Sequence, residues 1–337
     1  MRMQAIILGT IGTLVGFSAT AQGLSVQDML YQYNAVTSGD FESSQEVEGR
    51  VFVNGNLSGS NINIGFVPVP AGSDAVMVVN GNTTVGRING QNGNVYLNDP
   101  GTVSSSIERS GSGDVAVYVN GGFNGQDNFG IVHANQGDLS SKVPQIDFGG
   151  VSSYSSYLSG LSGAAYDGTN FNALNNAVQS EGENWNASKV TVYNTSLAQL
   201  QSGTFQSNLG SGETMIVNVS GTSGGFGLNA TGDMGVSGRI LWNFYEATDI
   251  DVNTKILGSV LAPKAKMNGF TGSTEGSVFA RAINLSNGEL HLQPFVGDIP
   301  TLGATSVPEI GAEGAAGAVI LVLGSLMVMS GRRRLAA

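Results

Sequence analysis

The feature that most constrains the fold is a short repeated segment in which a glycine and a polar residue precede three apolar residues. Copies start at Gly238, Gly258 and Gly276, which lie 20 and 18 residues apart. This spacing is the period of a solenoid, in which each coil carries short strands and stacks on the next. The alternative is a meander of hairpins, whose strands recur at about 8–12 residues. We therefore expect a mainly β fold, a right-handed parallel β-helix (β-solenoid).

The first half of the chain repeats a different sequence pattern, in which an apolar run is followed by Asn and Gly. The runs and their endings are 51–53 before Asn54-Gly55-Asn56, 76–79 before Asn80-Gly81-Asn82, and 115–119 before Asn120-Gly121-Gly122. Asn and Gly tolerate positive φ, so each run predicts a strand that ends in a tight turn. Two further strands are predicted at 190–193 and 215–219.

Two segments link the halves of the chain. Residues 48–53, Glu-Gly-Arg-Val-Phe-Val, are similar to residues 275–280, Glu-Gly-Ser-Val-Phe-Ala. We interpret them as the same kind of coil, so that N-terminal coils stack beside C-terminal ones.

Individual residues of the repeats have structural interpretations. Val260, Leu261 and Ala262 should fill the inside of a coil, and Gly258 and Gly276 should turn its corners. Pro263 should close a strand where no amide donor is required. We interpret Trp242, Phe244 and Phe295 as core or capping aromatics rather than a ligand platform.

The middle of the chain, about 148–180, has a helical pattern. Its apolar residues fall at helical spacing: Tyr154, Tyr157, Leu158 and Leu161, then Phe171, Leu174 and Val178. Gly160, Gly163 and Gly168 argue against one continuous helix. We expect a helical insertion of one or two helices packed along the solenoid, with a loop insertion as the alternative.

The N-terminus, residues 1–21, has the pattern of a secretory signal peptide. Arg2 is followed by an apolar run, and Ala19 and Ala21 form the small-x-small cleavage pattern. The alternative is an N-terminal membrane anchor, but the apolar run is short for a span. We expect export and cleavage by signal peptidase.

The C-terminus combines a short motif, an apolar run and a basic cluster. The motif is Val307, Pro308, Glu309 and Ile310, the run is 315–331, and the cluster is Arg332, Arg333 and Arg334. A basic cluster after an apolar segment marks the cytoplasmic side of a membrane stop. The run is at the lower limit of about 17–25 residues for a transmembrane helix. The run therefore suits transient retention of the chain in the membrane. The alternative is a permanent tail anchor.

These three parts, at 307–334, resemble the PEP-CTERM class of sorting signals. The start is similar to the variant named for Val-Pro-Glu-Ile-Asp, although Gly311 stands where that variant has Asp. The resemblance implies processing by an exosortase in a Gram-negative bacterium, with display at the cell surface, on the outer membrane or in the extracellular matrix.

Composition limits the partners. The chain has no cysteine, which excludes disulfides and thiolate metal sites. Without the two ends, 10 basic and 23 acidic residues remain, a net charge of about −13, so no basic face exists for nucleic acid. Charged residues are only 12% of the chain. Gly, Asn, Ser and Thr supply most of the polarity, which suits neutral polymers, glycans or ice, and equally suits an ordinary secreted β protein.

Three stretches together resemble the choice-of-anchor A family of bacterial surface proteins. They are 48–56; 240–248 (Ile-Leu-Trp-Asn-Phe-Tyr-Glu-Ala-Thr) with 258–263; and 275–280 with 288–291 and 294–295. The resemblance implies an adhesive β-solenoid joined to a C-terminal anchor, and a looser similarity to ice-binding β-helices that a helix flanks. It supplies no catalytic residue. The expected domains are a solenoid at 22–298, a linker at 299–306 and a sorting signal at 307–337.

The sequence gives little support for a catalytic or metal site. Residues 221–225 match G-x-S-x-G, but a match is expected by chance in so glycine- and serine-rich a chain, and no helix is predicted after it. His133 and His291 are the only histidines, and His291 shares a strand face with Glu289, as a weak metal pair or a structural hydrogen bond. Asp249, Asp251 and Asn253 could supply calcium ligands. We expect no catalytic, cofactor-binding or metal residues.

The sequence thus predicts a non-enzymatic surface adhesin or matrix protein that binds exopolysaccharide or cell-surface glycans. Ice binding is the first alternative, although Thr83-Thr84 and 271–274 form no regular Thr-x-Thr ladder. A polysaccharide-active enzyme on the same scaffold is the second, and it would need two convergent carboxylates.

Overall fold

The fold was analysed in a computed structural model, which describes residues 24–67, 74–110, 113–165, 190–207, 209–210, 212–232 and 234–300. The predicted signal peptide at 1–21 and the sorting signal at 307–337 lie outside these residues. So does the second part of the predicted helical insertion, from residue 166 onward.

The chain forms short strands that follow one another around successive coils. In the first run they are β1 Ala35–Thr37, β2 Phe41–Ser43, β3 Glu46–Val47, β4 Val51–Val53, β5 Leu57–Gly59, β6 Asn61–Ile64, β7 Ala75–Val79, β8 Arg87–Gly90, β9 Asn94–Leu97, β10 Thr102–Val103, β11 Ser106–Arg109, β12 Val117–Val119, β13 Gly122–Phe123 and β14 Val132–His133. The strands expected at 51–53, 76–79 and 115–119 are therefore present as β4, β7 and β12, within two residues.

A second run of coils follows the helical segment. Its strands are β15 Ala164–Ala165, β16 Val190–Ser196, β17 Thr204–Ser207, β18 Thr214–Ser220, β19 Ser223–Phe226, β20 Asn229–Gly232, β21 Ile240–Asn243, β22 Asp249–Val252, β23 Ile256–Leu257, β24 Ser259–Asn268, β25 Thr274–Glu275, β26 Val278–Leu285 and β27 Leu290–His291. The helices are α1 Val26–Gln32 and α2 Phe148–Ser159, with 3-10 turns η1 Ser140–Lys142, η3 Leu197–Gln199 and η4 Met234–Arg239.

Every strand pairing in the described residues is parallel, which places equivalent strands of successive coils side by side. Leu241 pairs with Ser259 and Val260 with Val278, so the repeats predicted from the 18–20 residue spacing are neighbouring coils. The fold is thus mainly β with parallel sheets, as expected, and hairpins are excluded there. The right-handed sense of the coils stays a prediction.

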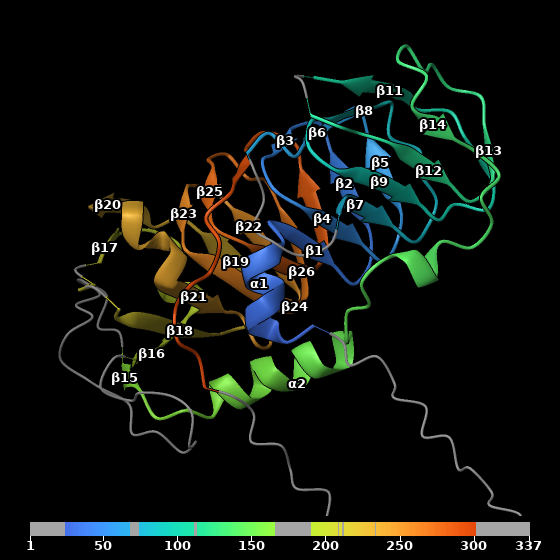
Figure 1. The fold of residues 1–337 in the computed structure, drawn as a ribbon. Coiled ribbons are helices and arrows are strands. Elements are labelled where there is room, and N and C mark those ends of the chain that lie inside the picture. The colour runs from blue at the N-terminus through green and yellow to red at the C-terminus, as the bar shows by residue number, and fades with distance from the viewer. Residues whose placement is uncertain are drawn as a thin grey trace, which may run out of the picture.

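The order of strands shows that the chain starts in the middle of the stack. The long sheet runs β14-β12-β9-β7-β4-β1-β26-β24-β21-β18-β16-β15. The first run thus grows outward from β1 to one end, and the second run starts at the opposite end and returns to β26. Ala35 of β1 pairs with both Val51 and Val278, which confirms that early and late coils stack together (Figure 1).

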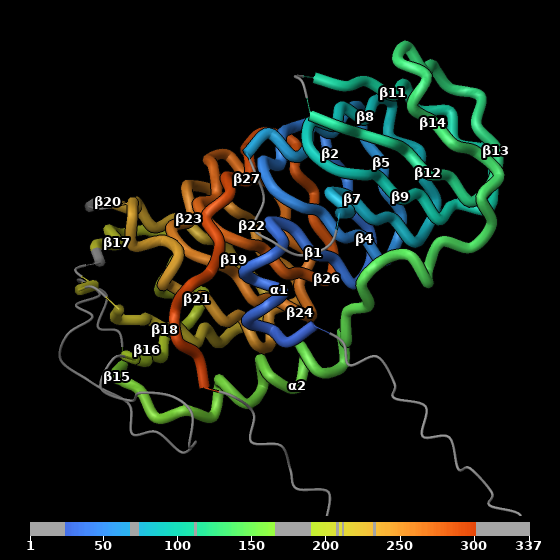
Figure 2. The backbone as a smooth tube through the Cα atoms, viewed as in Figure 1, coloured from blue at the N-terminus to red at the C-terminus, as the bar shows by residue number. Residues whose placement is uncertain are grey.

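The segment 134–163, which contains α2, connects the two ends of the stack along its outside, and α2 itself lies along β24, β21 and β18 (Figure 2). Asp147 caps its first turn, because its carboxylate accepts the Gly150 amide at 2.9 Å. Val151, Tyr154 and Leu158 are buried against the long sheet. The helix ends at Ser159, before Gly160, which agrees with the expectation that glycines interrupt this segment.

The coils have three faces. The first face is the long sheet, the second contains β2, β5, β10, β13, β19, β22 and the later halves of β24 and β26, and the third contains β3, β6, β8, β11, β23, β25 and β27. The bend between the first two faces of β24 lies at a register shift between Ala262 and Lys266. Pro263 therefore lies at a bend within β24 and does not close the strand, because the interrupted ladder needs no amide donor there.

Two apolar cores stabilise this arrangement. One fills the inside of the coils, and the other lies between the first face and a cover made by α1, η1, α2 and the segment 295–300. Trp242 and Phe244 belong to the inner core and Phe295 to the outer one, all fully buried, which confirms them as core aromatics. The packed part extends to Pro300, whose carbonyl accepts the Tyr154 hydroxyl at 2.6 Å.

The Asn-Gly segments do form corners, but the reason differs from the one expected. Gly55, Gly81 and Gly121 do not adopt positive φ. They lie above one another instead, and a Cβ on Gly81 would stand 2.5 Å from the Gly55 carbonyl oxygen. Close approach of stacked backbones, rather than a left-handed conformation, therefore selects glycine here. Gly258 does have φ +116 and turns the corner between β23 and β24, as predicted.

No helix among residues 24–300, as far as they are described, is long and apolar enough to cross a membrane. The helix predicted at 315–331 lies beyond that range.

Candidate binding surfaces

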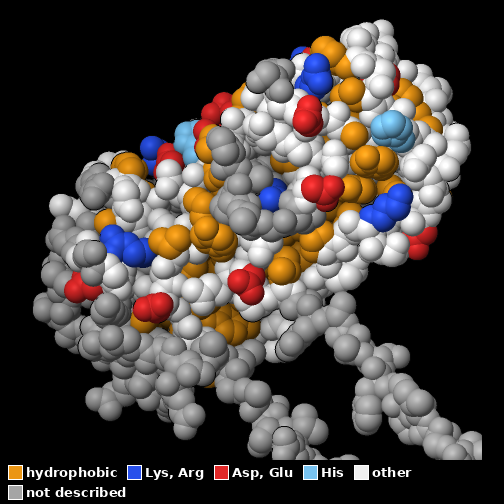
Figure 3. Space-filling view, viewed as in Figure 1, with side chains coloured by type: hydrophobic (Ala, Val, Ile, Leu, Met, Phe, Trp, Pro, Cys, Tyr) orange, Lys and Arg blue, Asp and Glu red, His pale blue; other side chains and the backbone are white. Residues whose placement is uncertain are grey.

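The first face of the stack is covered, which leaves the second and third faces as candidate binding surfaces. The outer core under α1 and α2 occupies the first face. On the side seen in Figure 3, charged side chains are few and scattered among neutral polar and apolar ones. Uncharged groups therefore make up most of the side seen in this view.

The second face carries a row of outward polar side chains in register. Ser58 pairs with Glu42 and Glu42 with Asn284, and Asn268 pairs with Asp251 in the later coils. Exposed side chains continue the face toward the first end: Thr84, Ser104 and Asn124, of which Ser104 donates to Asn124 at 2.7 Å. This row alternates with buried apolar residues, so strand periodicity holds it on one side of the sheet.

The third face carries amides in register and an ion pair. Asn63 and Asn89 occupy neighbouring coils in register and share a hydrogen bond at 3.3 Å. Arg87 and Glu108 form an ion pair at 3.4 Å, with side chains about 40% exposed. A surface pair of this kind contributes little to stability.

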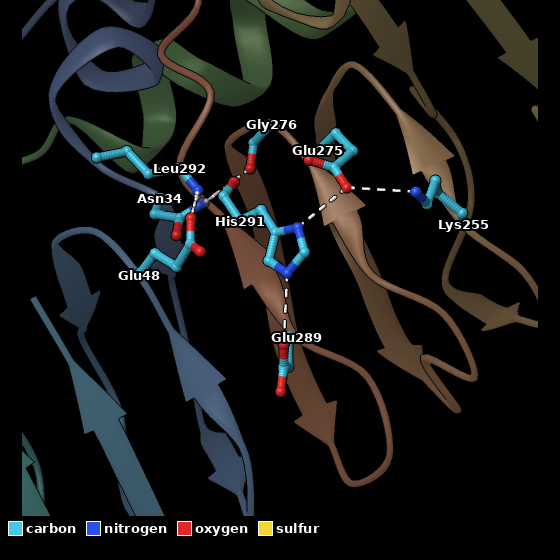
Figure 4. Close-up of polar contacts among 8 residues, drawn as sticks. All are labelled: Asn34, Glu48, Lys255, Glu275, Gly276, Glu289, His291 and Leu292. Atoms are coloured by element: carbon cyan, nitrogen blue, oxygen red, sulfur yellow. Dashed lines mark hydrogen bonds and ion pairs between the residues drawn. The ribbon is translucent and has the colours of Figure 1, made fainter. Parts of the chain in front are cut away.

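The charged residues concentrate where the two runs of coils meet (Figure 4). His291 of β27 lies between two carboxylates, with Nδ1 at 3.0 Å from Glu275 and Nε2 at 3.3 Å from Glu289. Lys255 approaches Glu275 at 3.5 Å, and Glu48 accepts the Leu292 amide at 2.7 Å. The expected hydrogen bond between His291 and Glu289 is present, and Glu275 is a second partner that the sequence did not reveal.

Both pKa shifts in this cluster reflect its excess of acid. Burial opposes the charged form of His291, but the hydrogen bond and charge of Glu275, the hydrogen bond of Glu289 and the charge of Glu48 outweigh it and raise the pKa of His291. Burial, then the charges of Glu289 and Glu48, raise the pKa of Glu46, which His291 partly offsets. The imidazolium form therefore helps to hold the junction together.

The calcium candidates lie apart from this cluster, on the second face. Asp249 and Asp251 are exposed on β22 with Ile250 buried between them, so they share a face as expected. Asp249 accepts the Asn268 amide at 3.3 Å. The described part of the chain contains no group of three or more His, Asp or Glu side chains that could hold a metal ion. Calcium binding therefore stays an untested alternative to the expectation that the chain has no metal site.

Neither the G-x-S-x-G match nor the threonines have the geometry that catalysis or ice binding would need. Ser223 begins strand β19 and strand β20 follows, so 221–225 do not form a strand-to-helix elbow. His133 stacks on Tyr118 with ring centroids 5.1 Å apart, at the far end of the first run. Thr83 and Thr274 are buried while Thr84 and Thr271 are exposed, so these threonines present no flat ladder.

A polar hollow lies where α2 ends, and sequence reasoning missed it. It measures about 290 Å³ and is lined by Ser159, Asn194, Thr195, Ser196, Gln199, Asn218, Ser220 and Tyr245. A signal was present in the sequence: Asn194, Asn218 and Asn243 recur 24 and 25 residues apart. An amide that recurs at a coil period inside apolar strands indicates a stacked ladder, and the structure places these three in register.

Comparison with known proteins places the chain in a family. Residues 26–292 match the family described as "Putative Ice-binding-like adhesive domain". No curated protein and no solved structure was found to match the chain. The matched residues run from α1 through β27, and thus include both runs of coils and the helix between them. The chain therefore belongs to the family of ice-binding-like adhesive domains.

Proposed function

We propose that this chain is a non-enzymatic, exported adhesin or matrix protein that binds exopolysaccharide or cell-surface glycans through an open face of its coils. The observation that carries the proposal is membership of the adhesive family over residues 26–292. The geometry adds a surface to it, because the second face presents hydroxyl, amide and a few charged side chains in register on a parallel sheet.

A regular face suits a repetitive ligand. Stacked coils repeat the same side-chain spacing, so a polymer with a repeating unit can make the same contact many times. Single neutral hydrogen bonds exposed to water contribute little each. Many copies of the domain on one cell would combine such weak contacts into firm attachment.

Display at the surface completes the proposal. The signal peptide at 1–21 would direct export, and 307–337 would hold the chain in the membrane until an exosortase transfers it to the outer surface of a Gram-negative cell. Replacement of Arg332, Arg333 and Arg334 by alanine should leave the chain unsorted. Cell fractionation compares the two proteins, and equal surface display would contradict the role of the cluster.

Co-sedimentation tests the adhesive function. The purified fragment 22–300 would be mixed with exopolysaccharide and envelopes from the producing organism, over a range of salt concentrations. We expect saturable retention that salt barely changes, because neutral hydrogen bonds are not screened as ion pairs are. Absence of retention by the folded fragment would refute the proposal.

Ice binding is the second candidate, favoured by the ice-binding-like character of the family. The second face offers Ser58, Thr84 and Ser104 on successive coils. Its acids, Glu42 and Asp251, interrupt any regular hydroxyl array. Thermal hysteresis in the purified fragment would establish this activity, and a freezing point equal to the melting point would exclude it.

A further inference from the structure

The hollow at the end of α2 is floored by a chain of side-chain amides that all point the same way. The Asn243 amide donates to Asn218 Oδ1 at 2.8 Å, and the Asn218 amide donates to Asn194 Oδ1 at 3.2 Å. Asn243 and Asn218 are 0% and 2% exposed, so this part of the ladder is dry. Asn194 is its partly exposed end.

Helix α2 fixes the ladder from above. Ser155 donates to Asn243 Oδ1 at 2.6 Å, and Asn243 returns a bond to the Ser155 carbonyl at 2.9 Å. The Asn218 amide also donates to the Leu158 carbonyl at 2.7 Å. These bonds leave the two buried amides little rotational freedom, so the orientation of Asn194 is set before any ligand arrives.

The ladder ends in an unused donor. Asn194 accepts from Asn218, and its own amide nitrogen has no hydrogen-bond partner among the described residues. The Tyr245 hydroxyl is likewise without one there. Hydrogen bonds in a chain polarise one another, so the terminal amide is a stronger donor than an isolated one. Both groups line the hollow.

The hollow exists because α2 ends before it covers the next row of outward side chains on the sheet. The helix covers the row of Asn194, Asn218 and Asn243, but it ends at Ser159. The next outward pair, Ser196 and Ser220, is in register and small, so it leaves space above the sheet. Tyr245, two residues beyond Asn243, contributes an aromatic ring to the wall.

We propose that this hollow is a binding site for a neutral sugar unit of a polysaccharide. All eight lining residues are uncharged at neutral pH, and they combine fixed amides, hydroxyls and one aromatic ring. A sugar ring offers several hydroxyl groups to such donors and acceptors, and an apolar ring face to tyrosine. The volume is at the small end of ligand sites, which suits one or two sugar units rather than a long chain segment.

This inference rests on the adhesive function and names one place where that function is carried out. It predicts that binding depends on the hollow rather than on the second face alone. The two ideas therefore differ in which substitutions weaken attachment.

Titration calorimetry on the full-length chain in detergent tests the site. The probes are cellotetraose, maltotetraose and mannotetraose, with tetragalacturonate as a charged comparison. We expect at least one neutral probe to bind and the charged probe to bind at least tenfold more weakly, since no cation lines the hollow. Failure of all three neutral probes to bind overturns the sugar assignment.

Two variants locate the binding. Asn194→Ala removes the terminal donor while Asn218 keeps Leu158 as a partner, and Ser196→Gln fills the hollow. Each should weaken neutral-sugar binding about tenfold, with an unchanged unfolding midpoint. Asn124→Ala and Ser104→Gln make the same changes on the second face and should leave sugar binding unchanged.

The same four variants in the matrix co-sedimentation assay separate this inference from the proposed function. Retention lost only with Asn194→Ala and Ser196→Gln supports the hollow. Retention lost only with the second-face pair overturns the hollow and leaves adhesion intact. A wild-type chain that neither sediments nor binds sugar refutes both.

Discussion

The two runs of coils fill their interiors with different residues. Between β1 and β14 the inner core is aliphatic, with Phe41 as its one fully buried aromatic ring among the described residues. Between β16 and β27 it contains Tyr193, Phe205, Phe226, Trp242, Phe244 and Phe270. The second run thus uses large rings where the first uses Val, Ile and Leu.

Coil length does not explain the difference. Successive coils reach 25 residues between Met215 and Ile240 in the second run and 26 between Val51 and Met77 in the first. Trp242 packs edge-on against Phe205 and Phe226, with centroids 5.0 and 5.2 Å apart, and its indole donates to the Leu257 carbonyl. The second run is thus distinguished by contacts between neighbouring rings, which fill its interior without voids.

The amide ladders also differ between the runs. In the first run Asn80 donates to Asn54 at 3.1 Å on the outside of a corner. In the second run, Asn218 and Asn243 form a buried ladder beneath α2. The same side chain therefore decorates the surface in one half and joins a helix to a sheet in the other.

Trp242→Ala should have the largest effect, because it removes a fully buried ring that packs against both Phe205 and Phe226. We expect a loss of about 4 kcal/mol in the free energy of unfolding. Ile88→Val, in the aliphatic run, should cost about 1 kcal/mol. Urea unfolding followed by circular dichroism measures both, and equal losses would show that the aromatic core has no special weight.

Asn243→Ala should lower the free energy of unfolding by about 3 kcal/mol. It leaves Asn218 Oδ1, the Ser155 hydroxyl and the Ser155 carbonyl without this hydrogen-bond partner in a buried core. Asn80→Ala removes a partly exposed ladder residue and should change the free energy of unfolding by less than about 0.5 kcal/mol. If the two variants unfold at the same urea concentration, the distinction between ladders is wrong.

Gly81→Ala tests the stacked corners of the first run. A Cβ there would meet the Gly55 backbone, which cannot move aside, so we expect a loss of about 2 kcal/mol. Gly149→Ala, in the first turn of α2, should be neutral or stabilising, because alanine favours helix. A fully stable Gly81→Ala protein would mean that the coils can separate locally.

The smallest effect should come from pH at the junction of the two runs. The raised pKa of His291 means that its imidazolium stabilises the fold fully below about pH 6.5, the unfolded value. That stability is lost as pH rises through the higher folded pKa. Glu46, Glu48, Glu275, Glu289 and Lys255 surround it, and Glu46, whose pKa is also raised, adds stability in the same direction as pH falls.

His291→Gln should therefore flatten the dependence of the unfolding midpoint on pH above about 6.5, the unfolded pKa of histidine. Chemical unfolding at several pH values measures this slope. An unchanged slope would assign the dependence to the carboxyls alone. His133→Gln, at the far end of the first run, serves as the matched control and should keep the wild-type slope.

Local patterns in the chain were enough to predict much of the fold. Strands at β4, β7, β12, β21, β24 and β26 follow from apolar runs bounded by glycine, and their period predicts parallel coils. The similarity of 48–53 to 275–280 predicted that early and late coils meet. These predictions succeed because strand periodicity and coil length are encoded by neighbouring residues.

Other features depend on residues far apart and were missed or misjudged. The polar hollow needs the end of α2 beside β16, β18 and Tyr245, and His291 meets Glu275 only because their coils are adjacent. Gly55 and Gly81 were assigned to positive φ, whereas contact with the backbone of the next coil selects them.

The sequence by itself determined the main strands of the long sheet, the stacking of the repeats, the junction of the two runs and the acidic, hydrogen-bonding surface. Only the tertiary structure decided which face is covered, where α2 stops and which amides become a buried ladder. The physical reason is that propensity and periodicity act between near neighbours in the chain. Coverage, cavities and hydrogen-bond partners depend instead on where distant coils come to lie.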